Sequence, residues 1–552
     1  IIGFKCMKKF IKLLLVIITS IFILTGCDIT STNGETKKLV TPYLEYGTNS
    51  IIWDSITNAD EYLIYVDDVY LTKTNHAYFD DFELSGKTGM LYIIASGDKS
   101  RFENSDISNK INLADLANVK SSYESKFLMI NDTHGAFVDN QYPGVERLAS
   151  LIKQLGDEYI KIANGDILQG SYISNILCGY PMIDALNNMN FNAYVIGNHE
   201  FDWGLDKIAE YKDGNLTNGE ANFPFLGANI IDKKTNEIVD FLEPYTIIEK
   251  KDVRVGIIGL IGSRLTSSIL YENVKDYEFI DCVDVAKKYA KELRTTKNCD
   301  VVVVAIHDYD YETNYQLAQL ENDETIDAIF CGHTHTYENE YQTRKDGVNI
   351  PIVENRDKNQ TAVSVLLELN VRKDLVKYSV NFYNPANFNL DPDMTKVLKE
   401  YQSYIDEGNR SLGIASSYLD KNTLGNISVE AMRDSFKTDF AILNTGGVRA
   451  YISDGNVTVS DVYNVFPFNN EVYLVEIKGS DLLRFYYNAD YYIYIKKEFN
   501  ASDIISDKTY NVAIIDYVFT NRYYQSYFGN VKYVDTDVIM RDLVIEYIDN
   551  LI

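Results

Sequence analysis

The sequence predicts a multi-domain protein that begins with an all-β sandwich and continues with two domains that mix helices and strands. Its 552 residues are enough for three or four domains. Residues 39–118 read as short alternating strands separated by turn residues, whereas residues 120–385 alternate strand-like and helical stretches. A hydrophobic share of 46% beside 24% charged residues is typical of a globular chain that buries real cores.

Changes in this patterning divide the chain into six segments. In order, we expect a signal peptide at 1–26, a polar linker at 27–38, a β-sandwich at 39–118, a layered α/β domain at 120–385, a connecting helix at 386–408 and an α/β or α+β domain at 409–552. Asp391-Pro-Asp393 opens the connecting helix, with Asp393 as its expected cap.

The first residues carry an export signal. Lys8, Lys9 and Lys12 precede an apolar stretch at 13–26, which is the pattern of a signal peptide. A membrane span needs ~20 apolar residues, so a retained span is the weaker alternative. The stretch ends in Leu-Thr-Gly-Cys27, which resembles a bacterial lipoprotein processing site. The resemblance implies a lipid on Cys27 and an anchored position at the extracellular face of the bacterial cell membrane.

The all-β segment resembles a fibronectin type III module. Its central stretch places Trp53 on one expected strand and Tyr62 with Ile64 on the next. A spacer is the favoured role, and a surface-binding module is the alternative. His76 lies here and is expected to be solvated or half-buried.

Five of the six histidines lie in short motifs that end apolar, strand-like runs. The motifs are, in chain order, Asp132-Thr-His134-Gly, Gly165-Asp166, Gly197-Asn198-His199-Glu-Phe-Asp202, the lone His307, and Gly332-His333-Thr-His335. The carboxyl ends of strands in layered α/β folds converge on one crevice, so these residues can share a site. Packing alone does not explain five runs that end in the same way.

These residue types suit two divalent cations. Asp166 is the expected bridge, because two cations about 3.5–4 Å apart need a shared ligand. Asp132 and His134 would hold the first ion. His333 and His335 have the same spacing and would divide between the ions.

Asn198 adds a neutral oxygen, which leaves the site able to attract phosphate. Coordination lowers the pKa of bound water from ~15.7 towards ~7, so a metal-bound hydroxide is the expected nucleophile. Oxygen and imidazole ligands accept Mn, Zn, Co or Ca, and the sequence leaves the identity of the metals open.

His199 and Asp202 are expected to form a catalytic dyad. They are three residues apart, which places both on one face of a first helical turn. Asp202 would orient the imidazole, and a cationic His199 would stabilise the leaving oxygen or the transition state by roughly 10²–10⁴-fold. The alternative is that Asn198 caps a helix and that the histidine packs beneath it.

Together the motifs resemble those of the calcineurin-like metallophosphoesterases, in the branch of 5′-nucleotidases and UDP-sugar hydrolases. The resemblance covers roughly residues 120–552. It implies one metal on Asp132, His134, Asp166 and His335, a second on Asp166, Asn198, His307 and His333, and His199 with Asp202 as the catalytic dyad.

The C-terminal half carries matches to the substrate-binding segments of the same family. The run from Asn444 through Gly446 and Gly447 to Arg449 is similar to the Asn-Gly-Gly-x-x-Arg loop, whose arginine grips the substrate phosphate. An ordinary glycine turn before a surface arginine is the alternative. Phe468 and Tyr517 lie in segments that resemble the two faces of a nucleobase clamp.

Two segments depart from the family pattern. Where the family has Gly-Gly-Asp-Gly to bind ribose, residues 521–524 read Asn-Arg-Tyr-Tyr. Another phosphate-binding arginine that the family carries before residue 424 is absent, and Lys421 is the nearby cation. The chemistry is therefore expected to be intact and the specificity altered.

The net charge of the chain makes some classes of binding partner less favourable. A net charge of −28 disfavours nucleic-acid polymers and anionic lipid headgroups. The leading hypothesis is an exported phosphohydrolase that removes phosphate from nucleotides. The alternatives are a hydrolase of 2′,3′-cyclic nucleotides, UDP-sugars or other small phosphoesters and, less favoured, a surface-binding protein without activity. The oligomeric state stays open.

Overall fold

The computed structural model describes residues 36–47, 50–80, 88–118, 122–215, 219–489, 493–495, 501–528 and 531–551. The chain divides into two compact units, Ile1–Ser121 and Ser122–Ile552. The predicted signal peptide and Cys27 lie outside the described residues. Among the helices of the described ranges, none combines the length and apolarity needed to span a membrane.

The first unit is built from strands. One sheet has the order β2-β3-β6, another has the order β5-β4-β7-β9, and β1 pairs with β8. The strands are β1 (Lys37–Lys38), β2 (Glu45–Gly47), β3 (Ser50–Ile52), β4 (Glu61–Val66), β5 (Val69–Thr74), β6 (Tyr78–Asp80), β7 (Met90–Ser96), β8 (Phe102–Glu103) and β9 (Ile111–Asn112). Both larger sheets contribute to one core, where the Trp53 and Tyr62 rings lie 5.2 Å apart. His76 is exposed. Strand β1 falls in the segment that the sequence predicted as linker.

Two six-stranded sheets form the centre of the second unit. The first sheet has the order β13-β12-β11-β10-β23-β24 and the second has the order β16-β17-β19-β20-β22-β21. The strands are β10 (Tyr123–Ile130), β11 (Tyr159–Asn164), β12 (Ala193–Val195), β13 (Phe225–Leu226), β16 (Tyr245–Lys250), β17 (Val253–Ile261), β19 (Val301–His307), β20 (Ala328–Phe330), β21 (Glu338–Thr343), β22 (Asn349–Glu354), β23 (Ala362–Leu369) and β24 (Leu375–Tyr383).

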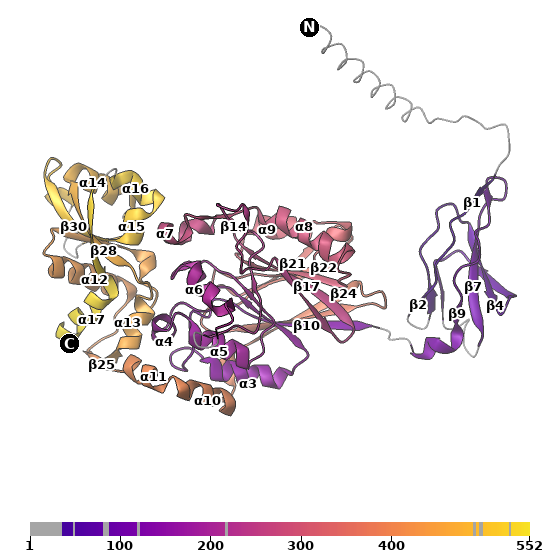
Figure 1. Ribbon diagram of the computed structural model, residues 1–552, viewed down its shortest axis with the longest axis horizontal. Helices are drawn as coiled ribbons and strands as arrows, with labels where there is room; N and C mark the ends of the chain where they lie inside the picture. The colour runs from indigo at the N-terminus through magenta and orange to yellow at the C-terminus, as the bar shows by residue number, and fades with distance from the viewer. Residues whose placement is uncertain are drawn as a thin grey trace, which may run out of the picture. The chain divides into compact units, whose positions relative to one another are not determined.

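Helices cover both outer faces of this pair of sheets (Figure 1). Phe127 and Met129 of β10 pack toward the second sheet, while Leu128 and Ile130 pack with α3 and α5 on the other face. The second sheet packs on α8. The remaining elements here are α3 (Val145–Leu155), α4 (Tyr172–Ile176), α5 (Tyr180–Asn188), α6 (Leu205–Ala209), α7 (Tyr271–Val274), α8 (Cys282–Thr295), α9 (Tyr311–Ala318), and the small sheet of β14 (Ile230–Asp232), β15 (Glu237–Ile238) and β18 (Tyr277–Phe279).

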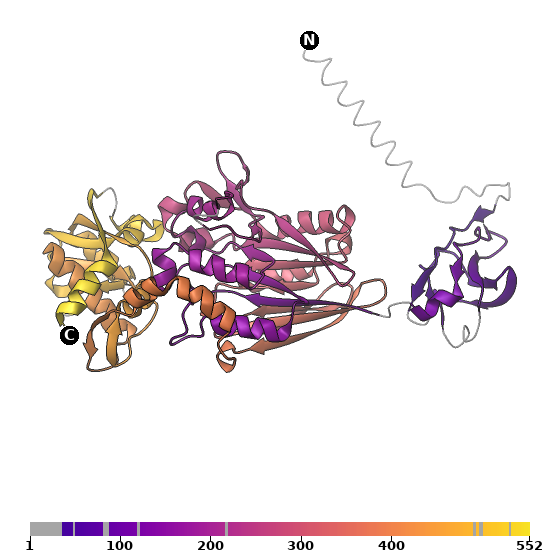
Figure 2. The same ribbon diagram turned by 60° about the horizontal axis from the view of Figure 1, so that its bottom comes forward.

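Two helices lead to the C-terminal part, α10 (Pro392–Glu400) and α11 (Gln402–Gly408) (Figure 2). The single connecting helix predicted for 386–408 is therefore two helices, separated at Tyr401. The N-cap of α10 is Asp391, whose carboxylate accepts the backbone N–H groups of Asp393 and Met394. The prediction of Asp393 as the cap was wrong, because Pro392 already occupies the first helical turn.

The C-terminal domain packs helices around a five-stranded sheet of order β29-β26-β30-β28-β31. The strands of this sheet are β26 (Phe440–Asn444), β28 (Glu471–Lys478), β29 (Ile493–Ile495), β30 (Thr509–Ile515) and β31 (Tyr533–Ile539). The domain also has a two-stranded sheet of β25 (Ser411–Ala415) and β27 (Gly455–Thr458). Its helices are α12 (Lys421–Phe436), α13 (Val459–Val465), α14 (Gly479–Ala489), α15 (Asp516–Thr520), α16 (Arg522–Phe528) and α17 (Met540–Leu551).

Candidate active site

The histidine motifs lie at the carboxyl ends of strands from both large sheets. Asp132 and His134 follow β10, Asp166 follows β11, Asn198 and His199 follow β12, His307 ends β19, and His333 and His335 follow β20. Within each sheet these strands pair in parallel, so their carboxyl ends meet at one edge.

Six of these side chains form two groups that could each hold a cation. Asp132, His134 and His335 make one group, and Asp166, His307 and His333 make the other, with the ligand atoms of each group within 4.8 Å of one another. In the first group the Nε2 atoms of His134 and His335 are 3.1 Å apart. His307 Nε2 lies 3.1 Å from Asp166 Oδ2 and 4.0 Å from Asp132 Oδ1, so the groups adjoin.

Buried atoms in both groups lack hydrogen bonds. In the described part of the chain, no hydrogen-bond partner reaches Asp132 Oδ1, Asp166 Oδ2, Asn198 Oδ1, His307 Nε2 or His333 Nδ1. A buried polar atom without a partner is costly, roughly 1–3 kcal/mol each. Carboxylate, amide and imidazole atoms that converge in this way fit divalent cations.

Backbone contacts fix the orientation of two of the imidazoles. His307 Nδ1 donates to the Asn164 carbonyl at 2.9 Å, and His134 Nδ1 donates to the Gln169 carbonyl at 3.2 Å. The proton on Nδ1 leaves the lone pair on Nε2, which faces the other ligands. Metal-binding histidines are usually oriented by such a bond.

The backbone at five of the predicted ligands is strained. The φ angles are positive at Asp132 (49°), His134 (48°), Asp166 (53°), His333 (80°) and His335 (60°). A residue with a side chain in this region costs of order 1–3 kcal/mol and persists only where its surroundings enforce it. The loops therefore hold these side chains in place at the expense of stability.

Glu200 organises two of the loops, a role that the sequence analysis missed although the residue lies inside the Gly-Asn-His-Glu motif. Its buried carboxylate accepts the N–H groups of Asp166 (2.9 Å), Ile167 (3.0 Å) and Gly197 (2.8 Å) and the Tyr194 hydroxyl (2.6 Å). It thus ties the loop after β11 to the loop after β12.

Glycine is required where these loops approach each other. A Cβ on Gly197 would overlap Asp166 Oδ1 and lie 2.9 Å from Glu200 Oε2, and a Cβ on Gly165 would overlap the His307 ring. Both positions therefore depend on the absence of a side chain.

His199 and Asp202, predicted as a catalytic dyad, are in contact. His199 Nδ1 lies 2.9 Å from Asp202 Oδ2, where His199 begins a 3₁₀ turn (His199–Phe201) and Asp202 is its C-cap. Burial lowers the pKa of His199, but the carboxylates of Asp202 and Asp166 outweigh it and hold that pKa above its usual value. Asn198 stands at the N-cap position of this turn, as the alternative expected, but its side chain makes no capping hydrogen bond.

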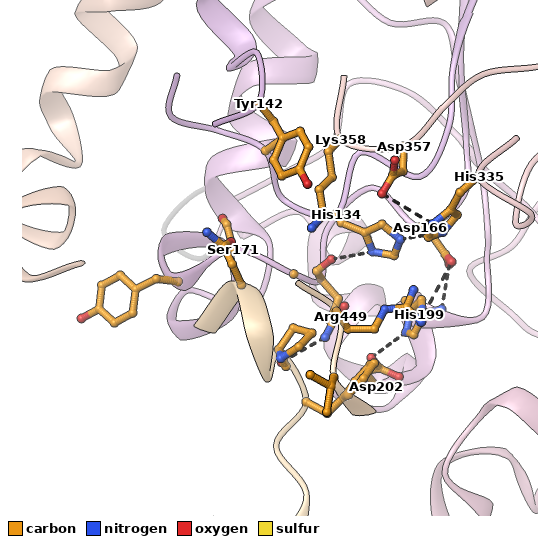
Figure 3. A pocket seen from close by; sticks show the side chains of 18 of the residues that line it. His134, Tyr142, Asp166, Ser171, His199, Asp202, His335, Asp357, Lys358 and Arg449 are labelled. Atoms are coloured by element: carbon orange, nitrogen blue, oxygen red, sulfur yellow. Dashed lines mark hydrogen bonds and ion pairs between the residues drawn. The ribbon is translucent and has the colours of Figure 1, made fainter. Parts of the chain in front are cut away.

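A cavity of about 930 Å³ lies beside the ligands and is lined by residues of both the layered domain and the C-terminal domain (Figure 3). The predicted residues that line it are His134, Asp166, Asn198, His199, Asp202, His333, His335, Asn444, Gly446, Arg449, Phe468 and Tyr517. Asp132 and His307 are fully buried and do not line it, and neither does Gly447. Residues more than 100 positions apart thus meet in one cleft.

The C-terminal side chains contact the dyad. The Phe468 ring stacks on His199 with 5.5 Å between centroids, and the Arg449 guanidinium lies 5.9 Å from the Phe468 centroid. The Tyr517 hydroxyl donates to the Ser267 carbonyl at 3.4 Å. A nucleobase clamp stays a prediction, and in this structure one face of Phe468 is already covered.

Three residues of the segment that departs from the family pattern do not line the cavity. Asn521 follows α15, and Tyr523 and Tyr524 belong to α16. Tyr524 is buried with its ring 5.8 Å from that of Phe485. None of these three residues is among those that line the cavity.

Two segments match known protein families. Residues 125–337 match the calcineurin-like phosphoesterases, and residues 399–488 match the 5′-nucleotidase C-terminal domain. The first match contains all seven predicted metal ligands and the dyad, and the second contains Arg449 and Phe468.

Individual relatives agree with these matches. The chain is 29% identical over 397 residues to the endonuclease YhcR of Bacillus subtilis, which covers 65% of this chain and 32% of that protein. It is 26% identical over 428 residues to the 5′-nucleotidase of Vibrio parahaemolyticus, which covers 66% and 74%. The solved 5′-nucleotidase precursor from Thermus thermophilus shares the fold, with a TM-score of 0.67 at 20% identity over 78% of this chain and 97% of that one.

Proposed function

Because the chain belongs to the calcineurin-like phosphoesterases that carry a 5′-nucleotidase C-terminal domain, we propose that it is an exported two-metal hydrolase that removes phosphate from nucleotides. The observation that carries the proposal is the cleft. On one wall it presents ligands for two cations with the His199 dyad, and on the other wall it presents Arg449 and Phe468.

The proposed metal ligands follow the two groups. Asp132, His134 and His335 would hold one cation, and Asp166, His307 and His333 the other, with Asp166 shared and Asn198 adding its amide oxygen. When bound, two divalent cations would supply Lewis-acid chemistry and activate water for attack on phosphorus.

The chain's own side chains bind and orient the phosphate. Arg449 would grip its oxygens, since a guanidinium binds phosphate through parallel hydrogen bonds. His199 donates from Nδ1 to Asp202, which turns Nε2 towards Asp166, 3.9 Å from its Oδ2. A proton on Nε2 can stabilise the charge that develops on the phosphate or on the leaving oxygen. The C-terminal domain lines one side of the cavity and would reduce the access of bulk water to the His199 imidazole.

A second candidate uses the same chemistry on another small phosphoester. It is favoured by the absence of Asn521, Tyr523 and Tyr524 from the described residues that line the cavity, since these positions stand where the family carries its ribose-binding segment. A 2′,3′-cyclic nucleotide or a UDP-sugar would then be cleaved. A surface-binding protein without activity is the least favoured reading, because it has no use for the strained ligand loops.

The location and the N-terminal domain belong to the same proposal. The Leu-Thr-Gly-Cys27 run supports a lipid anchor at the extracellular face of the bacterial cell membrane. The two sheets of the first unit support a fibronectin type III-like spacer between that anchor and the hydrolase.

The proposal is tested by phosphate release. The purified chain with added Mn²⁺ or Zn²⁺ is assayed on a panel of nucleoside monophosphates, 2′,3′-cyclic nucleotides, UDP-sugars and a base-free aryl phosphate. We expect phosphate release from the nucleoside monophosphates. Turnover confined to the cyclic or sugar substrates would favour the second candidate, and no release from any of them would refute both.

A further inference from the structure

Lys358 enters the cavity from a loop that the family motifs do not include. The loop follows β22 and packs on the first ligand segment, where the Lys358 N–H donates to the Asp132 carbonyl at 2.8 Å. The amide of the next residue, Asn359, donates to the carbonyls of Ala136 and Pro143 at 3.1 Å each. The loop is therefore fixed to the backbone that carries Asp132 and His134.

The conformation of this loop is strained. Lys358 and Asn359 have φ angles of 51° and 55°, two left-handed residues in succession. The left-handed conformation costs of order 1–3 kcal/mol for each residue with a side chain. With this backbone conformation the Lys358 side chain lines the cavity.

The Lys358 ammonium has no fixed anionic partner. Within the described ranges it makes neither a hydrogen bond nor an ion pair, and its contact is the face of Tyr142, 4.8 Å from Nζ to the ring centroid. The nearby Asp357 carboxylate faces His335 instead, 3.5 Å from its Nδ1. A partly buried ammonium in a ligand cavity without an anion is costly unless a ligand supplies one.

Other cations share the cavity with it. Lys421 at the start of α12 and Arg449 both line it, and burial together with these two charges lowers the pKa of Lys358 to about 8 against the opposing effect of Asp357. Figure 3 shows Lys358 with Tyr142 on one side of His134, and Arg449 with the dyad on the other. Lys358 therefore addresses a different position in the cleft from Arg449.

We propose that Lys358, with Lys421, binds a second anionic group of the substrate, so that the cavity favours small phosphoesters with two phosphoryl groups over those with one. This assignment rests on the proposed hydrolase function, in which the two cations and Arg449 hold the phosphate that is cleaved. Lys358 would bind the additional phosphate. Lys358 is in this sense a specificity-determining residue.

The test compares the binding of ADP and AMP. Isothermal titration calorimetry is done on the full, metal-loaded chain with non-hydrolysable phosphonate analogues of the two nucleotides, so that the cations are present and no turnover occurs. We expect Lys358→Gln to weaken the binding of the ADP compound by about 10-fold or more, through the loss of a charge-assisted hydrogen bond. Binding of the AMP compound should weaken by about twofold at most. Lys358→Arg keeps the cation and should restore most of the ADP affinity.

The control is Lys275→Gln, which removes a lysine of the same domain that pairs with Glu272 outside the cavity and should change neither affinity. Equal losses for ADP and AMP in Lys358→Gln would overturn the proposal, because Lys358 would then serve the phosphate that both share. An unchanged ADP affinity would overturn it as well.

Turnover separates this inference from the proposed function. With ADP and AMP themselves as substrates, the substitution Lys358→Gln should lower kcat/KM for ADP more than for AMP, through KM. If the wild-type chain with metal releases phosphate from neither nucleotide, the proposed function fails, while the selectivity measured in the binding experiment still decides the role of Lys358.

Discussion

His199 is the residue that separates catalysis from metal binding. Its Nδ1 is held by Asp202, and it belongs to neither group of ligands. We therefore expect His199→Asn to keep both metals and to lose ~10²-fold or more in kcat. Metal analysis and steady-state kinetics on the same sample check this expectation, and loss of metal in the variant would show that the imidazole is a ligand.

At the same scale, the sequence revealed the residues that lie in local motifs and missed those that depend on long-range contacts. Asp166 and His307 stand out because each ends an apolar run. Glu200 lies in a motif, but its partners are backbone groups of another loop, which no local pattern reveals. Lys358 is one of many lysines in the sequence, and only the left-handed loop that follows β22 turns it into the cleft.

The loops after β11 and β12 act as one element because they interlock without space for a side chain. Gly197→Ala should push Asp166 out of position, since the new Cβ would overlap its Oδ1. We expect loss of metal and of turnover. Gly204→Ala is the control, because its φ of 81° carries strain of about 1–2 kcal/mol but no atom lies within 4 Å of the new Cβ. Metal analysis and thermal unfolding should show a less stable Gly204→Ala variant with full metal, and full metal in Gly197→Ala would contradict the account.

At the scale of the elements, the sequence predicted whether a segment is helix or strand better than where it ends and how it packs. The alternation of strands and helices in residues 120–385 is visible in the sequence because inner strands of the first sheet are buried on both faces, as Phe127 and Leu128 of β10 illustrate. The break between α10 and α11 is not visible, since the helical pattern continues through Tyr401, which is buried in the core beside the first sheet. The position of Tyr524 likewise depends on its packing against Phe485, which no local pattern reveals.

At the scale of the whole molecule, the cleft makes the C-terminal domain responsible for specificity. Arg449→Ala should raise KM for every substrate, because the loss of charge-assisted hydrogen bonds removes about 1.5–3 kcal/mol of binding free energy. Phe468→Ala should cost ~1–3 kcal/mol for nucleotides, through lost stacking, and little for a small phosphoester without a base or other aromatic ring. Kinetics on both substrates distinguish the two variants. If Phe468→Ala slows both substrates equally, its stacking on His199 matters more than any contact with a base.

The central claim is that one cleft holds two cations that share Asp166. The most direct measurement is the metal content of the purified wild-type chain and of Asp166→Asn, by mass spectrometry of the metals, with phosphate release from AMP recorded on the same samples. We predict two divalent ions per wild-type chain, fewer in Asp166→Asn, and no turnover in the variant, because one neutral oxygen cannot hold two cations together. Two bound metals and full activity in Asp166→Asn would contradict it.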